Sequence, residues 1–299
     1  MKTLKIAGIS GVTLLVGVMG TATASADTAQ LTDLDKTIAS QLPYCNVGKI
    51  GDPQPIIKID STGVTSSHVT AVQDGDPDIS VGDSWYLGTS ELTNSTDKTI
   101  KLTSQSFTKA ISESVKNSVS QGLKVTNKIS AKFQITKGIS IGDDFTTEYS
   151  FNSTTESRKE ETFSFTSPPQ EIDVPPHTVA HVTVNLQKVE ATGKVALKAT
   201  LGGTFDEVQY ARDHSYGIGE KNLSLYDCLS TAQKTGKAPA LPSTLTLDDA
   251  NKKVKFNGTG TYTATYGTNY LVNVTFAPQV PGATVPKPFS RTISTNEKA

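Results

Sequence analysis

The chain has 299 residues, with 28 basic and 29 acidic side chains and a formal net charge of −1. This balance, with a pI near 6.4, excludes the strong positive field by which many proteins attract nucleic acid or anionic lipid. Hydrophobic residues are 35% of the chain and aromatic residues 7%, which favours extended sheets with solvated faces over one thick apolar core.

Residues 1–26 have the pattern of a secretory signal peptide, with early lysines, an apolar run over 6–18, and small residues at Ala24-Ser25-Ala26. The apolar run is too short for a membrane anchor and ends in small and polar residues. We therefore expect a secreted protein whose mature chain begins at Asp27. No later segment has the uninterrupted apolar length of a transmembrane helix.

The first expected element of the mature chain is a helix. Apolar residues recur there at helical spacing, at Leu31, Leu34, Ile38 and Leu42. Thr32, with Asp35 three residues later, predicts the N-cap, and Pro43 ends the helix. This is the one clear helix of the sequence, and we interpret it as a packing element without chemistry of its own.

The sequence contains two cysteines, Cys45 and Cys228. An even number of cysteines in an exported chain predicts a disulfide, which here would close a loop of roughly 180 residues. Two free thiols are the alternative. The disulfide would place the N-terminal segment beside Tyr226-Asp227-Cys228.

The rest of the chain has the pattern of strands separated by Gly, Pro and Asp turns. We expect strands at 56–59, 68–72, 85–93, 99–102, 161–166, 178–190 and 195–200, and in four short runs between 245 and 276. Pro168-Pro169 and Pro175-Pro176 bracket a sharp connection. The segment 203–242 is expected to be irregular, and the Pro-rich tail from Ala277 to be extended.

Between Leu123 and Phe151 the sequence alternates apolar and polar residues with a period of two, which is typical of strands with one dry and one wet face. The apolar positions include Val125, Ile129, Phe133, Ile135, Ile139, Ile141, Phe145 and Tyr149. The polar positions include Lys124, Lys128, Lys132, Asp144 and Glu148. Thr136-Lys137-Gly138 supplies a three-residue turn with glycine in third place, so the stretch is predicted to be a β-hairpin.

This turn sets the expected register of the hairpin. Pairing Ile135 with Ile139 places Phe133 opposite Ile141, with the apolar side chains on one face. The thirteen residues Leu123–Ile135 would then span roughly 30 Å when tilted as in a barrel, which matches the hydrocarbon core of a bilayer.

Two interpretations fit such a hairpin. It can be an ordinary two-sided hairpin of a soluble β-sandwich. It can also contribute two strands to a membrane barrel formed by several copies of the chain. The length of the strands and a wet face rich in Ser, Thr and Lys favour the barrel. Asn127 and Thr147 are polar exceptions on the dry face.

No catalytic, metal-binding or cofactor motif is found, and we expect a protein that is not an enzyme. His177 and His181 lie four residues apart, which on a strand separates them by about 13 Å, too far to share a zinc ion. Ser95-Thr-Asp-Lys98 lacks the companion motifs of an SxxK enzyme. The run from Asp74 to Asp78 begins like a calcium loop but lacks its glycine and its bidentate glutamate.

A family resemblance is carried by segments in and around the hairpin. They are 91–96, 107–121, 149–151, 168–179 (Pro-Pro-Gln-Glu-Ile-Asp-Val-Pro-Pro-His-Thr-Val), 182–190 and 193–195. In this order the chain resembles the aerolysin-like β-pore-forming toxins, most closely the epsilon-toxin and mosquitocidal-toxin branch. The resemblance covers residues 90–205 well, 205–276 weakly and 27–90 hardly at all. Asp143, on the dry face, departs from the family pattern.

The resemblance implies a mainly β, elongated, aerolysin-like fold with long twisted antiparallel strands, a small α+β head and an amphipathic insertion hairpin. The expected parts are a receptor-binding head at 27–90, joined in space by 205–240, a middle pore-forming β domain at 91–204 with the insertion hairpin 123–151, a C-terminal β region at 241–276, and a tail at 277–299 that is a candidate activation peptide.

The resemblance also implies an activity. A soluble monomer would bind a glycan or protein receptor on the target cell, assemble with identical copies, typically as a heptamer, and insert one hairpin per copy into a shared barrel in the target membrane. The apolar hairpin residues would face lipid and the charged ones the lumen, and before insertion the apolar face would pack against the middle domain. The alternative function is a secreted β protein that binds cell-surface glycan or protein without lysis.

Two further sets of residues follow from the resemblance. Tyrosines of the expected head are candidates for receptor binding, the alternative being a role in the core or its rim: Tyr44, Tyr210, Tyr216 and Tyr226, with Trp85 as a further candidate. Members of the family are often activated by removal of a C-terminal peptide. Arg291, in an expected exposed tail, is the candidate cleavage point.

Overall fold

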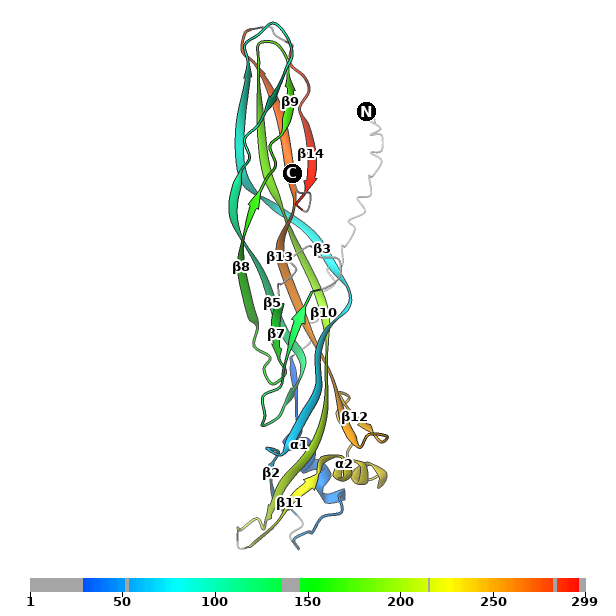
Figure 1. The fold of residues 1–299 in the computed structure, drawn as a ribbon. Coiled ribbons are helices and arrows are strands. Elements are labelled where there is room, and N and C mark those ends of the chain that lie inside the picture. Colours follow the sequence, from blue (N-terminus) through cyan, green and yellow to red (C-terminus); the bar gives the residue numbers. More distant parts are fainter. Residues whose placement is uncertain (1–28, 52–53, 136–145, 215, 282–283, 296–299) are drawn as a thin grey trace, which may run out of the picture.

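The computed structural model describes residues 29–51, 54–135, 146–214, 216–281 and 284–295, which form an elongated, mainly β molecule (Figure 1). Its framework is a set of three very long strands, β3 (Val64–Asn94), β10 (Thr178–Tyr210) and β13 (Lys253–Pro278). β10 lies in the middle and pairs antiparallel with β3 on one side and with β13 on the other. The expected mainly β, elongated architecture is confirmed.

Shorter elements complete the fold around this framework. They are β1 (Gln30–Asp33), α1 (Leu34–Gln41), a 3-10 turn (Leu42–Tyr44), β2 (Ile56–Asp60), β4 (Ile100–Thr103), β5 (Thr108–Lys124), β6 (Ser130–Gln134), β7 (Thr146–Ser150), β8 (Ser157–Thr166), β9 (Glu171–Val174), β11 (Gly217–Ser224), α2 (Leu225–Lys234), β12 (Leu245–Asp248) and β14 (Phe289–Ser294). Halfway along the molecule the strands form one sheet in the order β3-β10-β13-β5-β8.

The single strand β10 replaces the two strands expected at 178–190 and 195–200. Gly193 does not interrupt this strand. It lies directly opposite Tyr262, and a Cβ there would come within 2.6 Å of the tyrosine ring, which explains the glycine at this position. A bulge between Leu186 and Lys188 shifts the register. The buried side chains of β10 consequently change from even to odd positions, and one strand serves two different cores.

The buried apolar residues form two cores. The lower core lies under the hairpin and extends into the helices, and includes Val195, Leu197, Tyr262, Leu34 and Leu229. The upper core lies nearer the opposite end of the long strands, and includes Ile111, Val182, Val184, Val272 and Val274. A long sheet with two cores explains the low hydrophobic content of the sequence, because much of the strand surface stays in contact with solvent.

The head forms the lower end of the molecule in Figure 1. There the last residues of β10 pair with β2 and β11, and helices α1 and α2 pack against this small sheet. The boundaries expected near residues 90 and 204 fall inside β3 and β10. Continuous strands therefore join the head to the rest of the molecule.

Helix α1 begins one residue later than the expected N-cap implies. Asp33 is the N-cap, and its Oδ1 accepts a hydrogen bond from the backbone N–H of Lys36 at 3.1 Å. The expected cap, Thr32, is held in β1, and its hydroxyl lies 2.6 Å from that of Thr244. Tertiary contacts thus take the threonine away from the helix and leave the neighbouring aspartate to cap it.

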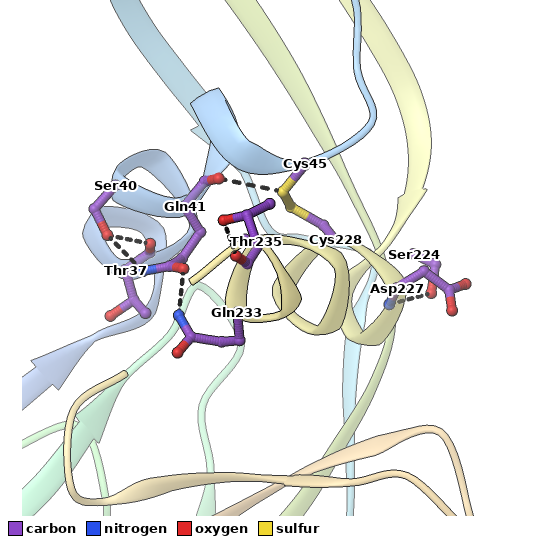
Figure 2. Close-up of a disulfide and its surroundings, with 10 residues drawn as sticks. Thr37, Ser40, Gln41, Cys45, Ser224, Asp227, Cys228, Gln233 and Thr235 are labelled. Atoms are coloured by element: carbon purple, nitrogen blue, oxygen red, sulfur yellow. Dashed lines mark hydrogen bonds between the residues drawn. A yellow bond between two sulfur atoms is a disulfide. The ribbon is translucent and has the colours of Figure 1, made fainter. Parts of the chain in front are cut away.

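Helix α2 lies in the segment expected to be irregular. Ser224 caps it by accepting a hydrogen bond from the N–H of Asp227, so Ser224-Leu-Tyr-Asp227 is the start signal of this helix. The helix carries Cys228, whose expected disulfide to Cys45 is present (Figure 2). Gln233 donates from Nε2 to Oε1 of Gln41 at 2.7 Å and further ties the two helical segments together.

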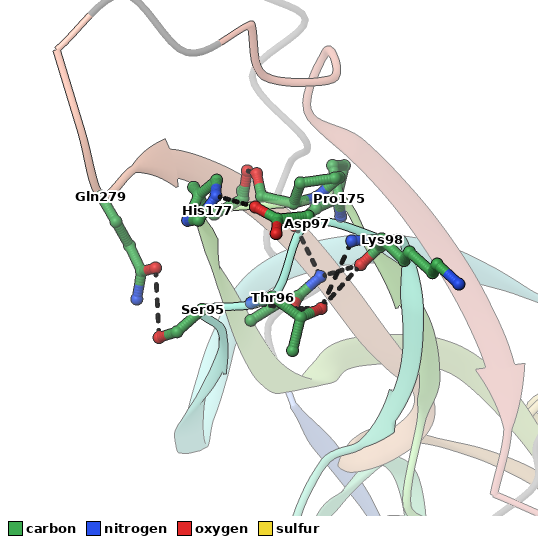
Figure 3. A network of polar contacts seen from close by, with 10 residues as sticks. Ser95, Thr96, Asp97, Lys98, Pro175, His177 and Gln279 are labelled. Atoms are coloured by element: carbon green, nitrogen blue, oxygen red, sulfur yellow. Dashed lines mark hydrogen bonds and ion pairs between the residues drawn. The ribbon is translucent and has the colours of Figure 1, made fainter.

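The opposite end of the molecule is held by a polar network around the turn between β3 and β4 (Figure 3). Nδ2 of Asn94 lies 2.8 Å from the carbonyl oxygens of Lys98 and Val174 and 2.9 Å from that of Pro175. Nε2 of His177 lies 2.9 Å from Asp97. This network fastens the Pro-bounded connection found in the sequence to the neighbouring turn.

The tail is not simply extended. Its residues Phe289–Ser294 form β14, which pairs antiparallel with Asn269–Val274 of β13. The expected signal peptide 1–26 lies outside the described residues. Among the residues that are described, no helix has the length and apolar character needed to cross a membrane.

Replacing Cys45 and Cys228 by serine is expected to lower the free energy of unfolding by about 2 to 5 kcal/mol, because the bond joins residues 183 apart and restricts the unfolded chain. Urea denaturation followed by circular dichroism measures the change, with the reduced wild-type protein as the matched control. An unchanged urea midpoint in both samples would contradict this role for the disulfide.

Candidate membrane-insertion hairpin

The hairpin expected at Leu123–Phe151 is present as the antiparallel pair β6–β7, which lies over the lower half of the long sheet (Figure 1). The apolar positions Ile139, Ile141 and Phe145 and the polar position Asp144 lie outside the described residues. The remaining expected lipid-facing and lumen-facing positions can be placed.

The register differs from the expected one. Phe133 pairs with Thr147, and Gln134 with Thr146, where the three-residue turn had placed Phe133 opposite Ile141. The shift is an even number of residues, so each side chain keeps its face. Packing selects this register, because it brings the rings of Phe133 and Tyr149 to 5.5 Å from one another, against Tyr262 of β13.

The expected continuous strand Leu123–Ile135 is wrong for this structure. β5 ends at Lys124, β6 begins at Ser130, and the residues between them leave the strand. Polar contacts to the start of β3 hold this break. Nδ2 of Asn127 donates to the carbonyl oxygens of Thr62 and Val64, at 3.0 and 2.9 Å.

The dry face of the hairpin is covered by the sheet. The apolar positions expected to face lipid, where described, are all buried in the lower core: Val125, Ile129, Phe133, Ile135 and Tyr149. The ring of Phe133 lies 5.2 Å from that of Tyr262 and is fully buried. The amphipathic pattern therefore marks a face that the folded chain hides from water.

The wet face of the hairpin points into solvent. Its described charged positions are all exposed: Lys124, Lys128, Lys132 and Glu148. Lys132 and Glu148 are direct cross-strand neighbours, and Lys124 pairs with Asp33 at 3.0 Å. Exposed ion pairs of this kind contribute little to stability.

Four hydrogen bonds among the described residues hold β7 against the rest of the protein, one of them from Nδ2 of Asn117 to the carbonyl oxygen of Glu148 at 3.0 Å. Nδ2 of buried Asn117 donates to Oγ1 of Thr147 at 3.0 Å, and Nζ of Lys159 donates to the carbonyl oxygen of Thr146 at 2.8 Å. The hydroxyl of Tyr149 donates to the carbonyl oxygen of Thr261 at 2.7 Å. Burial raises the pKa of that hydroxyl, which keeps it protonated as a donor.

Sequence reasoning missed Asn117 and Lys159, because neither belongs to the alternating stretch. Asn117 lines a cavity of 340 Å³ between β5, β7 and the connection that leads into β8, and Lys159 reaches the backbone of β7 from β8. The partners of these side chains come from the hairpin. Only the folded arrangement brings them together, and no local sequence signal could have identified them.

A buried carboxyl group lies between the two cores. Glu113 of β5 is 2% exposed, and its Oε1 accepts a hydrogen bond from the N–H of Gly267 at 2.8 Å. Burial raises the pKa of Glu113 to about 7. Across the strand pair lies Glu161, which forms an ion pair with Lys159, and Tyr266 of β13 lies close by.

The tyrosines expected to bind a receptor lie in or near the head but differ in exposure. Tyr216 is 50% exposed, and Tyr210 has Nζ of Lys58 at 5.3 Å from its ring centroid. Tyr44 is partly buried. Tyr226 is buried, and its hydroxyl donates to Oδ1 of Asp249 at 2.6 Å, which removes it from the surface that a receptor could touch.

Two other candidates are placed away from the head. Trp85 lies in the upper half of β3, packs against the upper core and has Nζ of Lys188 at 5.9 Å from its ring centroid. Arg291 is exposed within β14, opposite Val272. In the described part of the chain, no group of three or more potential metal ligands comes together.

The family model described as Clostridium epsilon toxin ETX/Bacillus mosquitocidal toxin MTX2 matches residues 36–280. The chain belongs to this family. The match extends well beyond residues 90–205, where the sequence resemblance is strongest, and includes most of the head. The sequence matches no curated protein.

Solved structures show the same aerolysin-like fold. The Mpp75Aa1.1 β-pore-forming protein from Brevibacillus laterosporus is similar with a TM-score of 0.60 at 19% identity, over 89% of this chain and 97% of that one. The Cry23Aa1–Cry37Aa1 binary complex gives 0.59 at 17% identity, over 89% and 96%. A non-toxic crystal protein from Bacillus thuringiensis gives 0.56 at 16% identity, over 85% and 100%. Family membership thus supports assignment to the pore-forming toxins of the aerolysin type, and the shared fold is consistent with it.

Stability is expected to fall as the pH rises from about 5 to about 7.5. The unfolded chain releases the Glu113 proton near its ordinary pKa of 4.5, whereas the folded chain holds it until about 7. The folded state therefore loses up to about 3 kcal/mol across this window. Urea midpoints at several pH values measure the loss.

Glu113→Gln is expected to flatten this dependence, because the amide still accepts a hydrogen bond from Gly267 but does not titrate. Glu190→Gln, at an exposed position of β10, is the matched control and is expected to retain the wild-type slope. Equal slopes in all three proteins would show that Glu113 does not hold its proton.

Proposed function

We propose that the protein is a secreted pore-forming toxin that binds a receptor on the target cell, assembles with identical copies and inserts residues 123–151 of each copy as two strands of a β-barrel. One observation carries the proposal. The amphipathic pair β6–β7 is docked by its apolar face on the folded protein and exposes its charged face. This is the arrangement expected of a soluble form that stores a membrane-spanning element.

Insertion requires the hairpin to leave the sheet and to straighten. Residues 125–129, which leave the strand in the stored form, would rejoin β5 to β6 and restore the length of roughly 30 Å needed to cross a bilayer. The bonds that Asn127, Thr147 and Tyr149 make with the rest of the protein would break. Closing a barrel then satisfies every strand edge, which compensates for the lost contacts.

In the inserted state, alternate residues take the two environments of the barrel. The lipid-facing set is Val125, Ile129, Phe133, Ile135, Ile139, Ile141, Phe145 and Tyr149. The lumen-facing set is Lys124, Lys128, Lys132, Asp144 and Glu148. A ring of seven copies is the expected assembly, because it is the typical number in the resembled toxins.

Receptor binding is assigned to the head. The exposed ring of Tyr216, with the ring of Tyr210 and the partly buried Tyr44, supports a surface that contacts a glycan or protein by ring stacking and hydroxyl hydrogen bonds. Secretion agrees with the expected signal peptide and with the disulfide, which is typical of proteins from oxidising compartments.

The rival function is a secreted β protein that binds cells without lysing them. The fold alone does not distinguish the two functions, since a non-toxic crystal protein shares it.

An engineered disulfide that locks the hairpin to the folded protein would distinguish the two functions. Oγ1 of Thr147 lies 3.0 Å from Nδ2 of Asn117, so Asn117→Cys with Thr147→Cys would join the hairpin to β5.

The locked protein is expected to bind susceptible cells but to cause no dye release until a reductant opens the lock. The measurements are dye release from cells and liposomes, and SDS-resistant oligomers on unboiled gels, with a panel of insect, nematode and mammalian cells. Reduced wild-type protein and Asn117→Ala/Thr147→Ala are the controls, because reductant also opens the native disulfide. Equal leakage from the oxidised lock would exclude hairpin insertion. Binding of the wild type without leakage or oligomers would favour the rival function.

Activation is assigned to cleavage after Arg291. Trypsin is expected to raise the potency of the wild-type protein and to leave Arg291→Gln unactivated, because removing part of β14 frees the edge of β13 that it covers. Mass spectrometry of the products locates the cut, and Lys287→Gln is the matched control. Full potency of the uncleaved protein would overturn this step.

A further inference from the structure

The five-stranded sheet at mid-height has two edge strands, β3 and β8, with no hydrogen-bonded neighbour on their outer side in the described part of the chain, although β6 also lies close to β3. β3 pairs only with β10, and β8 pairs only with β5. Figure 1 shows β8 and β3 on opposite sides of the molecule at this height. Unpaired edges are sites at which another chain can add, and soluble proteins protect them with charge and bulges.

Hydrogen-bonded register connects the two edges residue by residue. Three successive rows cross all five strands: Asp78–Thr192–Thr263–Lys116–Arg158, Ile79–Ala191–Ala264–Val115–Lys159 and Ser80–Glu190–Thr265–Ser114–Glu160. The Asp78 row faces solvent, and the Ile79 row faces the lower core. Asp78 and Arg158, which have opposite charges, therefore occupy the two ends of one outward-facing row.

The β3 edge is both apolar and acidic. Ile79 is 51% exposed and Val81 is 64% exposed. Four exposed aspartates lie along the same stretch: Asp74, Asp76, Asp78 and Asp83. Two β3 edges brought together would oppose these carboxylates, so pairing of β3 with β3 is unfavourable. The start of the β8 edge carries Arg158 and Lys159, which have the opposite charge and pair within the chain with Glu160 and Glu161.

The direction of the strands allows the edges of neighbouring copies to meet. Each strand in the order β3-β10-β13-β5-β8 is antiparallel to the next. The two edge strands, β3 and β8, therefore run in the same direction. Copies related by rotation about one axis would present β8 of one copy to β3 of the next at the same height. Such a head-to-tail contact generates a closed ring when the rotation closes.

We propose that β3 of one copy docks along β8 of the next, with Asp78 facing Arg158 of the next copy and Ile79 covered by the aliphatic part of its Lys159. The proposal rests on the proposed function and assigns its subunit contact. Arg158 contacts Glu160 within its own chain, and Asp78 makes no ion pair with any described residue. The neighbouring copy thus supplies the missing partner of the aspartate.

A charge swap tests the contact. Asp78→Arg and Arg158→Asp are each expected to lower dye release and the yield of SDS-resistant oligomers at least tenfold, because each places like charges together. The double variant restores the opposite pair and is expected to recover to within about threefold of the wild type. Recovery also shows that both single variants fold. Asp83→Arg, which makes the same charge change at a bulged position outside the three rows, is the matched control and is expected to stay near wild-type activity.

The outcomes separate the two proposals. If the wild type forms pores and the single variants do so equally well, or the double variant is no better than the singles, the β3–β8 contact is wrong and the proposed function stands. If Asp83→Arg is as harmful as Asp78→Arg, the loss comes from the overall charge of the β3 edge, and the proposed pairing of Asp78 with Arg158 is wrong. If the wild type forms neither pores nor oligomers on any susceptible membrane, the proposed function fails and this contact fails with it.

Discussion

Burial of the hairpin's dry face is the constraint on which the rest of this structure depends. A strand face long enough to cover the hydrocarbon core of a bilayer is a large apolar patch in water unless another surface covers it. Here the covering surface is the long sheet, and its shape fits the hairpin. Gly260 leaves room for the ring of Tyr149, since a Cβ at Gly260 would lie 2.7 Å from that ring. β10 and β13 are long enough to form one continuous surface that covers the hairpin.

The parts of the molecule are held together by interactions of very different strength. The head is closed by a covalent bond between segments 183 residues apart. The hairpin is held by packing and by individual hydrogen bonds, each of which contributes about 1 kcal/mol. Glu113, Glu161 and Lys159 form a polar layer where the upper and lower cores meet, and Lys159 also contacts the hairpin. The element that is proposed to move is thus held by many weak contacts, while the head is fixed by a covalent bond.

The sequence predicted those features that depend on local pattern. Period-two alternation identified the two faces of the hairpin, and the even number of cysteines predicted the disulfide. The register was wrong, because turn chemistry favours a tight loop after Ile135 while the rings of Phe133, Tyr149 and Tyr262 favour another pairing. The break after Lys124 depends on Asn127 reaching the start of β3, which no local pattern records. The sequence did not predict helix α2, although Ser224 and Asp227 mark its start, because the helix has only ten residues and lies in a segment rich in turn signals.

The two polar exceptions on the dry face, Asn127 and Thr147, acquire a physical reason in the structure. Both side chains bond to the folded protein, Asn127 to the start of β3 and Thr147 to Asn117. In the stored form they are satisfied partners that fix where the hairpin docks. In the proposed barrel they would face lipid, where an unsatisfied polar group is costly. Each lies only four residues from an end of Leu123–Phe151, near the interface, where that cost falls to about 0 to 1 kcal/mol. The exceptions therefore occupy positions at which a polar side chain stabilises the stored form and is tolerated in the membrane.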